Sequence, residues 1–213
     1  RAAESYQVEI VKAPPVVKHQ YFDPANPPVD LPPLKKWEKG STEAKFNFKV
    51  NFDVEVIASE RNENNFVVVI SPKRTRVKLT LPITIWIPRG APEKEGHRLI
   101  NETIYKDAQK LVRFHAQTMG DSRYKGEGNS YEEALTCAYR LAAEDLNTVY
   151  RRYVYDYSIS VGDEYDRLTK HGLNKVPEGA AIQQAFQNCG AYAREFDEVR
   201  EFLKLQDEDK NRN

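Results

Sequence analysis

The order of hydrophobic and polar residues divides the chain into a strand-rich half and a helical half. In the first half, apolar residues occupy every second position over 46–56 and again over 77–87. Such alternation predicts half-buried strands of an antiparallel sheet. A short apolar segment over 66–70 is predicted as a further strand, followed by a polar turn over 71–74. Pro82 cannot donate a hydrogen bond to a neighbouring strand, so the last strand is predicted to be an edge strand or to break there.

Beyond these strands the apolar spacing becomes three and four residues, which is typical of helices with one buried face. The first helix is predicted over 92–119, because proline suits a first helical turn. Ser130 and Glu133 form a capping box at the start of a second helix, whose apolar stripe reaches Tyr153. A third helix is predicted over about 180–205. The sequence therefore predicts an α+β fold, with an antiparallel sheet from the N-terminal half packed on two to three helices of the C-terminal half.

The prolines set the beginning of the chain apart from the rest. Seven of the twelve prolines lie between Pro14 and Pro33. This density predicts an extended, partly polyproline arm over 1–43 that lies along a surface. A single domain over 44–205 and a charged tail over 206–213 account for the remainder, because 213 residues are compatible with one compact domain.

Charge and hydropathy exclude two classes of partner. The 32 basic and 32 acidic residues cancel, so no net field favours nucleic acid. No apolar run approaches the length of a membrane span. A peptide or protein partner stays open. Because the chain starts at Arg1 without a methionine, we expect a removed signal segment and export to the periplasm or the cell exterior. An arbitrary choice of first residue explains this start equally well.

Cys137 and Cys189 lie 52 positions apart on separate predicted helices. In an oxidising compartment a disulfide between them would contribute about 3–4 kcal/mol by closing that loop. In a reducing compartment they would be two small buried hydrophobic residues. The spacing leaves both alternatives open, and it contains no C-x-x-C metal motif.

The segment Glu93-Lys94-Glu95-Gly96-His97 is the first candidate for chemistry. On a helix, residues four apart share a face, so Glu93 and His97 can point at one metal ion. The same spacing is also common in helices without a ligand. Lys94 is already protonated at neutral pH and cannot act as a general base.

The remaining histidines give weaker indications. His171, followed by Gly172, can either project towards the first helix as a metal ligand or act as a favourable cation at a helix C-terminus. His115 follows His97 by eighteen residues, roughly 27 Å along one helix, so the two cannot share an ion. His19, in the proline-rich arm, has no predicted role.

Taken together, these motifs resemble a bacterial family of secreted zinc-dependent proteases. The resemblance depends on strands that end at Pro88, on residues 93–97, and on the segment Tyr165-Asp166-x-x-Thr169-x-His171-Gly172. In that family a β-rich front precedes a helix with the motif H-E-x-G-H. The resemblance covers about residues 46–172 and implies a zincin-like α+β fold.

Position by position, the resemblance also implies a set of site residues. His97 matches the second zinc histidine, His171 a third ligand, and Tyr165 a nearby hydrogen-bond donor. Glu93 replaces the first histidine and Lys94 replaces the general base, so the catalytic group is missing. Because a carboxylate can bind zinc, Glu93, His97 and His171 can still form a mixed zinc site.

The sequence therefore predicts an exported, non-catalytic module on a zinc-protease-like scaffold, with binding or structural duties and no catalytic residue. No cofactor is expected, and zinc is the alternative. One competing function is a metal-dependent peptidase with an altered Glu93, His97 and His171 site. The other is a purely structural interaction protein of the cell envelope.

Overall fold

The computed structural model describes residues 6–34 and 38–190, and these residues pack in two compact units. The first unit comprises Arg1–Lys12, Asn47–Leu79 and Ala108–Arg152. The second comprises Ala13–Phe46, Thr80–Asp107 and Tyr153–Asn213. The predicted single domain over 44–205 and the predicted tail over 206–213 stay predictions, and the tail lies outside the described residues.

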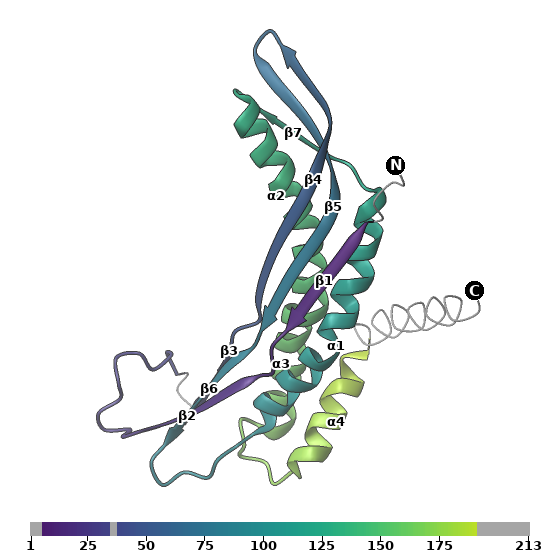
Figure 1. Ribbon diagram of the computed structural model, residues 1–213. Coiled ribbons are helices and arrows are strands. Elements are labelled where there is room, and N and C mark those ends of the chain that lie inside the picture. Colours follow the sequence, from purple (N-terminus) through teal and green to yellow (C-terminus); the bar gives the residue numbers. More distant parts are fainter. Residues whose placement is uncertain (1–5, 35–37, 191–213) are drawn as a thin grey trace, which may run out of the picture. The chain divides into compact units, whose positions relative to one another are not determined.

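Within the described residues seven strands form two sheets, in agreement with the predicted α+β class (Figure 1). They are β1 (Gln7–Lys12), β2 (Val16–Phe22), β3 (Ser41–Ala44), β4 (Asn47–Asn62), β5 (Asn65–Thr80), β6 (Pro82–Pro88) and β7 (Tyr124–Gly128). Four α-helices, a 3-10 turn and a π-helical turn complete the described part of the chain. They are α1 (Gly96–Thr118), η1 (Met119–Asp121), α2 (Tyr131–Tyr150), η2 (Arg151–Asp156), α3 (Tyr157–Thr169) and α4 (Glu178–Asn188).

The sheets are mixed, with parallel pairs beside the predicted antiparallel ones. In the first unit the strand order is β1-β5-β4, with β7 also paired to β5. In the second unit the order is β2-β6-β3. β1 pairs with β5 and β2 pairs with β6 in parallel. The reason is that parts of the predicted proline-rich arm form strands, which join the sheets in the parallel direction.

The polar segment over 71–74 does not form the predicted turn, because β5 runs through it. Buried side chains on β5 fall on even positions at Val68 and Ile70, and on odd positions from Thr75 onward. Ser71 and Pro72 are both buried between these two stretches. Such a change of phase within a strand is typical of a β-bulge. The strand instead ends at Thr80, so the predicted interruption at Pro82 is confirmed.

The helices differ from the prediction mainly at their ends. α1 begins at Gly96 and not near Pro92. The Ser130 cap of α2 is confirmed, because its hydroxyl accepts a hydrogen bond from the backbone N–H of Glu133 at 3.2 Å. The region between α2 and α4, read from the sequence largely as a loop, is helical through η2 and α3. The predicted third helix is present as α4, and residues 191–205 lie outside the described part of the chain.

Two further expectations concern cysteines and membranes. Cys137 and Cys189 are both free thiols, so of the two alternatives that the sequence left open the structure has the one without a disulfide. The Sγ atom of Cys189 instead donates to the carbonyl of Ser160 at 3.5 Å. Within the described residues, none of the helices combines the length and the apolar character required to cross a bilayer.

Close packing of α2 against β7 in the first unit gives a stability prediction. A methyl group at Gly126 would overlap the carbonyl oxygen of Ala134 and the backbone nitrogen of Ala138, and both alanines are fully buried. We expect Gly126→Ala to lower the free energy of unfolding by about 2–3 kcal/mol, because backbone atoms cannot move aside as a side chain can. Urea unfolding followed by circular dichroism measures this. Gly179→Ala is the matched control, since nothing lies within 4 Å of its added methyl group; an equal loss in both variants would contradict the packing argument.

The contact between α3 and α4 gives a pH prediction. Hydrogen bonds from Arg167, and then from Asn188, lower the pKa of Glu164 from 4.5 to about 2. The stabilisation from ionised Glu164 is therefore present at neutral pH and is lost as the pH falls through about 2. We expect Arg167→Met to raise this pKa towards 4.5. Carboxylate ¹³C NMR of glutamate-labelled protein measures the shift, and an unchanged titration would show that Arg167 is not its cause.

Candidate metal-binding site

The connection from β6 to α1 folds back beside β2 in the second unit. The N–H of Arg89 donates to the carbonyl of Phe22 at 2.9 Å, which joins the ends of the two strands. The chain then reverses at Gly90, whose φ of 81° lies in the left-handed region that glycine adopts without strain. This turn brings the residues before α1 next to β2, where Glu93 contacts Tyr21 and Glu95 contacts His19.

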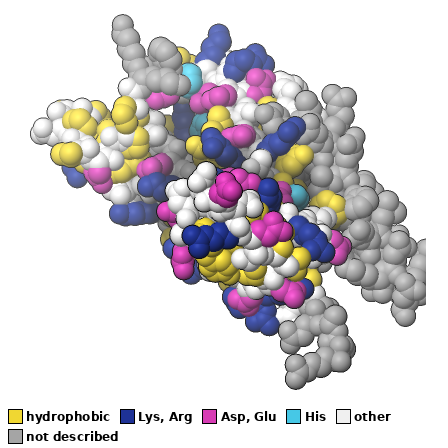
Figure 2. Space-filling model, turned by 90° about the horizontal axis from the view of Figure 1, so that it is seen from above, with side chains coloured by type: hydrophobic (Ala, Val, Ile, Leu, Met, Phe, Trp, Pro, Cys, Tyr) yellow, Lys and Arg dark blue, Asp and Glu magenta, His cyan; other side chains and the backbone are white. Residues whose placement is uncertain are grey.

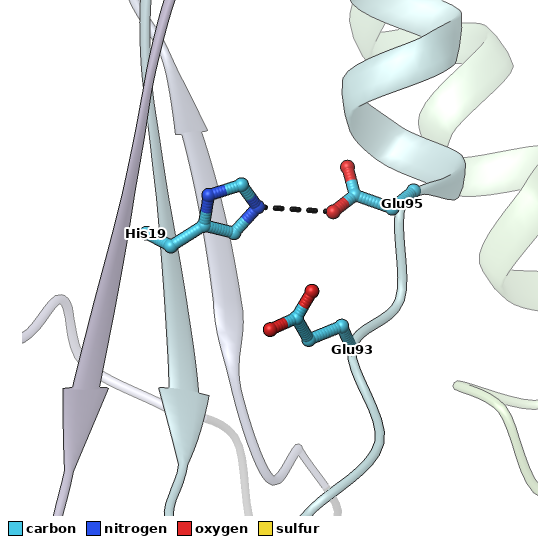
Figure 3. A group of neighbouring side chains, drawn as sticks. All are labelled: His19, Glu93 and Glu95. Carbon is cyan, nitrogen blue, oxygen red and sulfur yellow. Dashed lines mark hydrogen bonds and ion pairs between the residues drawn. The ribbon is translucent and has the colours of Figure 1, made fainter.

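Glu93 and Glu95 meet His19 of β2 in one cluster (Figure 3). One ligand atom from each of the three residues lies within 4.8 Å of the other two. The His19 Nε2 atom is 3.0 Å from Oε1 of Glu95. In the described part of the chain, this is the group of three that could hold a metal ion.

Tyr21 is also part of this cluster. It is two residues from His19 on β2, so both side chains leave the same face of the strand. Its hydroxyl donates a short hydrogen bond to Oε1 of Glu93. This bond to a carboxylate raises the pKa of the Tyr21 phenol.

Arg98 holds the second oxygen of Glu95. Its guanidinium donates to Oε2 of Glu95 and, at 2.7 Å, to Oε2 of Glu102. Partial burial raises the pKa of Glu95, but the hydrogen bonds from Arg98 and His19 outweigh it, so the pKa lies below its ordinary value. Glu95 is therefore ionised at neutral pH and presents its other oxygen, Oε1, to His19.

Lys94 faces the C-terminus of α3 instead of this cluster. Its ammonium donates to the carbonyl of Gly172 at 3.2 Å. Lys170, His171 and Gly172 all have left-handed φ angles, of 47°, 54° and 85°, and end the helix there. A cation near exposed carbonyls at a helix C-terminus is favourable. In the zinc-protease family that the sequence resembles, the position of Lys94 holds the catalytic base. Here Lys94 instead contacts the carbonyl of Gly172.

His97 and His171 both contact Asp166, a residue that the sequence did not single out. The His97 Nε2 atom lies 2.9 Å from one oxygen of Asp166, and the His171 Nδ1 atom lies 3.5 Å from the other. Tyr165 packs edge-on against the His97 ring, with 5.2 Å between ring centroids. Burial raises the pKa of Tyr165 to about 12, so it is a neutral phenol at physiological pH.

The predicted ligands Glu93, His97 and His171 therefore divide between two places. Glu93 lies with His19, while both other residues lie at Asp166. The helix-face argument for pairing Glu93 with His97 was wrong, because α1 begins only at Gly96. A mixed site of these three residues stays a prediction that only a bound ion can test.

Sequence reasoning missed His19, Tyr21 and Asp166. Val17, His19 and Tyr21 occupy alternate positions, as in a strand. Because prolines flank them, the sequence predicted an extended arm there and not a strand of a sheet. Asp166 was quoted only as part of a motif. Glu95 was not predicted as a ligand, because the segment 93–97 was expected to be helical and α1 begins only at Gly96.

The charge environment outside the cluster is mixed. Basic and acidic side chains are interspersed over the face in Figure 2. This distribution agrees with the zero net charge of the chain.

The arginine contact gives a testable prediction for the site. We expect Arg98→Met to raise the pKa of Glu95, because the variant removes the strongest of the interactions that favour its carboxylate form. Carboxylate ¹³C NMR detects this, and Arg167→Met is the control that should leave Glu95 unchanged. If the pKa of Glu95 is the same in Arg98→Met, the guanidinium does not hold this carboxylate.

Comparison of the chain with protein-family models, with curated proteins and with solved structures found no match. The relationship to zinc-dependent proteases accordingly stays a prediction from the motifs of the sequence.

Proposed function

We propose that the protein is a non-catalytic binding module that captures a metal ion on His19, Glu93 and Glu95. The observation that supports this proposal is the mutual approach of the three ligand atoms within 4.8 Å. Ligand atoms about 2.0–2.2 Å from a zinc ion lie only about 3.4 Å apart. Side-chain adjustment alone would therefore bring the three ligand atoms close enough to bind one ion. An imidazole nitrogen and carboxylate oxygens are common ligands of transition metals.

The way the residues reach the cluster also supports binding. His19 comes from a strand, and the two glutamates come from a turn fixed to that strand by the Arg89 to Phe22 hydrogen bond. The hydrogen bond between His19 and Glu95 already directs their side chains towards each other. A bound ion would lie between these two groups and replace that hydrogen bond. His19 and Glu93 are exposed and Glu95 is partly buried, so an ion can enter from solvent.

A metal-dependent hydrolase is the second candidate. Three protein ligands leave a coordination position for water, as in catalytic zinc sites. The contact between Lys94 and Gly172 argues against it, because the residue at the position of the family base is a cation bound to a carbonyl. Binding without hydrolysis is therefore the preferred function, and export stays a prediction that cell fractionation tests.

Metal titration tests the proposal. We expect untagged protein to bind one Zn²⁺ or Mn²⁺ ion per chain in isothermal titration calorimetry. His19→Ala and Glu93→Gln should each weaken binding by about 100-fold or more, since removing even a supporting residue costs 10–100-fold. His115→Gln is the matched control, because His115 contacts Asp145 in the first unit and has no place in the cluster.

The same titration separates the competing sites. If His97→Ala or His171→Ala abolishes binding while His19→Ala does not, the ion binds near Asp166 and the proposal is wrong. Hydrolysis of a casein substrate that a chelator abolishes would support the hydrolase candidate over a binding module.

A further inference from the structure

Tyr21 lies at the proposed metal site without serving the hydrophobic core. Its side chain is 55% exposed. The contact that holds its hydroxyl is the hydrogen bond to Oε1 of Glu93, one of the proposed ligands. Because His19 and Tyr21 leave the same face of β2, the phenol oxygen and the imidazole are directed towards the same pair of carboxylates.

We propose that Tyr21 is the fourth ligand of this site and that the ion it selects is ferric iron. This inference rests on the proposed function, since His19, Glu93 and Glu95 supply the other ligands. It adds the phenolate and the identity of the ion.

The set of donor atoms is the first argument for ferric iron. With Tyr21 the site offers one imidazole nitrogen and oxygens from three acidic groups. Oxygen donors suit hard cations, whereas thiolates and multiple imidazoles suit zinc and copper. The tyrosine oxygen is an established ligand of iron in proteins.

Charge balance is the second argument. Once an ion displaces the proton of the Tyr21 hydroxyl, which donates to Glu93 in the ion-free site, Glu93, Glu95 and Tyr21 would provide three negative charges, matching the three positive charges of ferric iron. A divalent ion on the same ligands would leave one negative charge in excess. Arg98 binds Oε2 of Glu95 and leaves Oε1 for the ion, so it acts as a positioning residue.

The binding step balances without any redox partner. A bond forms between the iron and the phenol oxygen as the O–H bond of Tyr21 breaks, and the proton passes to solvent at the exposed ring. Glu93 exchanges its hydrogen bond from Tyr21 for a bond to the ion. The iron stays ferric throughout, and the chelator that delivers it is released.

Visible absorption tests this inference directly, because a phenolate bound to ferric iron gives an intense charge-transfer band in the visible range. We expect the wild-type protein, titrated with ferric nitrilotriacetate, to develop such a band that saturates at one iron per chain. Resonance Raman excitation within the band should enhance tyrosinate ring modes. Tyr21→Phe should lose the band and retain Zn²⁺ binding, because it keeps the other three ligands.

Tyr155→Phe is the matched control, since Tyr155 is also an exposed tyrosine and lies on η2 outside the cluster. It should retain the full band. Circular dichroism of both variants checks that the fold is intact.

The outcomes distinguish this inference from the proposed function. If the wild-type protein binds Zn²⁺ but gives no band with ferric iron, or if Tyr21→Phe keeps the band, the ferric assignment is wrong and the metal site stands. If the wild-type protein binds neither ion, both are wrong.

Discussion

The parallel pairing of β2 with β6 is the constraint on which the proposed site depends. It sets His19 beside Ile85 and Tyr21 beside Ile87, residues 66 positions further along the chain. Ile83, Ile85 and Ile87 of β6 are almost fully buried, and burial of each such side chain contributes about 1.5–3 kcal/mol. The buried isoleucines of β6 therefore fix the sheet, and His19 and Tyr21 on the same face of the edge strand β2 remain exposed and can present polar groups.

A second constraint is that the backbone before α1 is not helical. In this segment Glu93 and Glu95 contact β2, whereas Lys94 between them contacts the carbonyl of Gly172 at the end of α3. On a helix the same residues would be distributed differently, with Glu93 next to His97. The start of α1 at Gly96 thus decides which residues can share an ion.

Local signals in the sequence predicted much of the fold and part of the site. The alternation over 46–56, the Ser130 cap and the break at Pro82 depend on neighbouring residues, and each is present in the structure. The sequence did not predict the contacts between distant segments of the chain. No pattern of neighbouring residues predicts that β2, which lies among prolines, pairs in parallel with β6. The sequence therefore gave no predicted partner for His19.

The protonation states around the cluster favour holding an ion over activating a water molecule. A hydrolytic site needs a base that contacts the metal-bound water without itself being a ligand. Glu93 and Glu95 are both proposed ligands, Arg98 is always protonated, and the Tyr21 hydroxyl donates a hydrogen bond to Glu93. The remaining carboxylate described next to the cluster, that of Glu102, accepts a hydrogen bond from Arg98. The same arrangement provides anionic oxygens that can compensate the charge of a cation. The site is consequently better suited to retain an ion than to use it for hydrolysis.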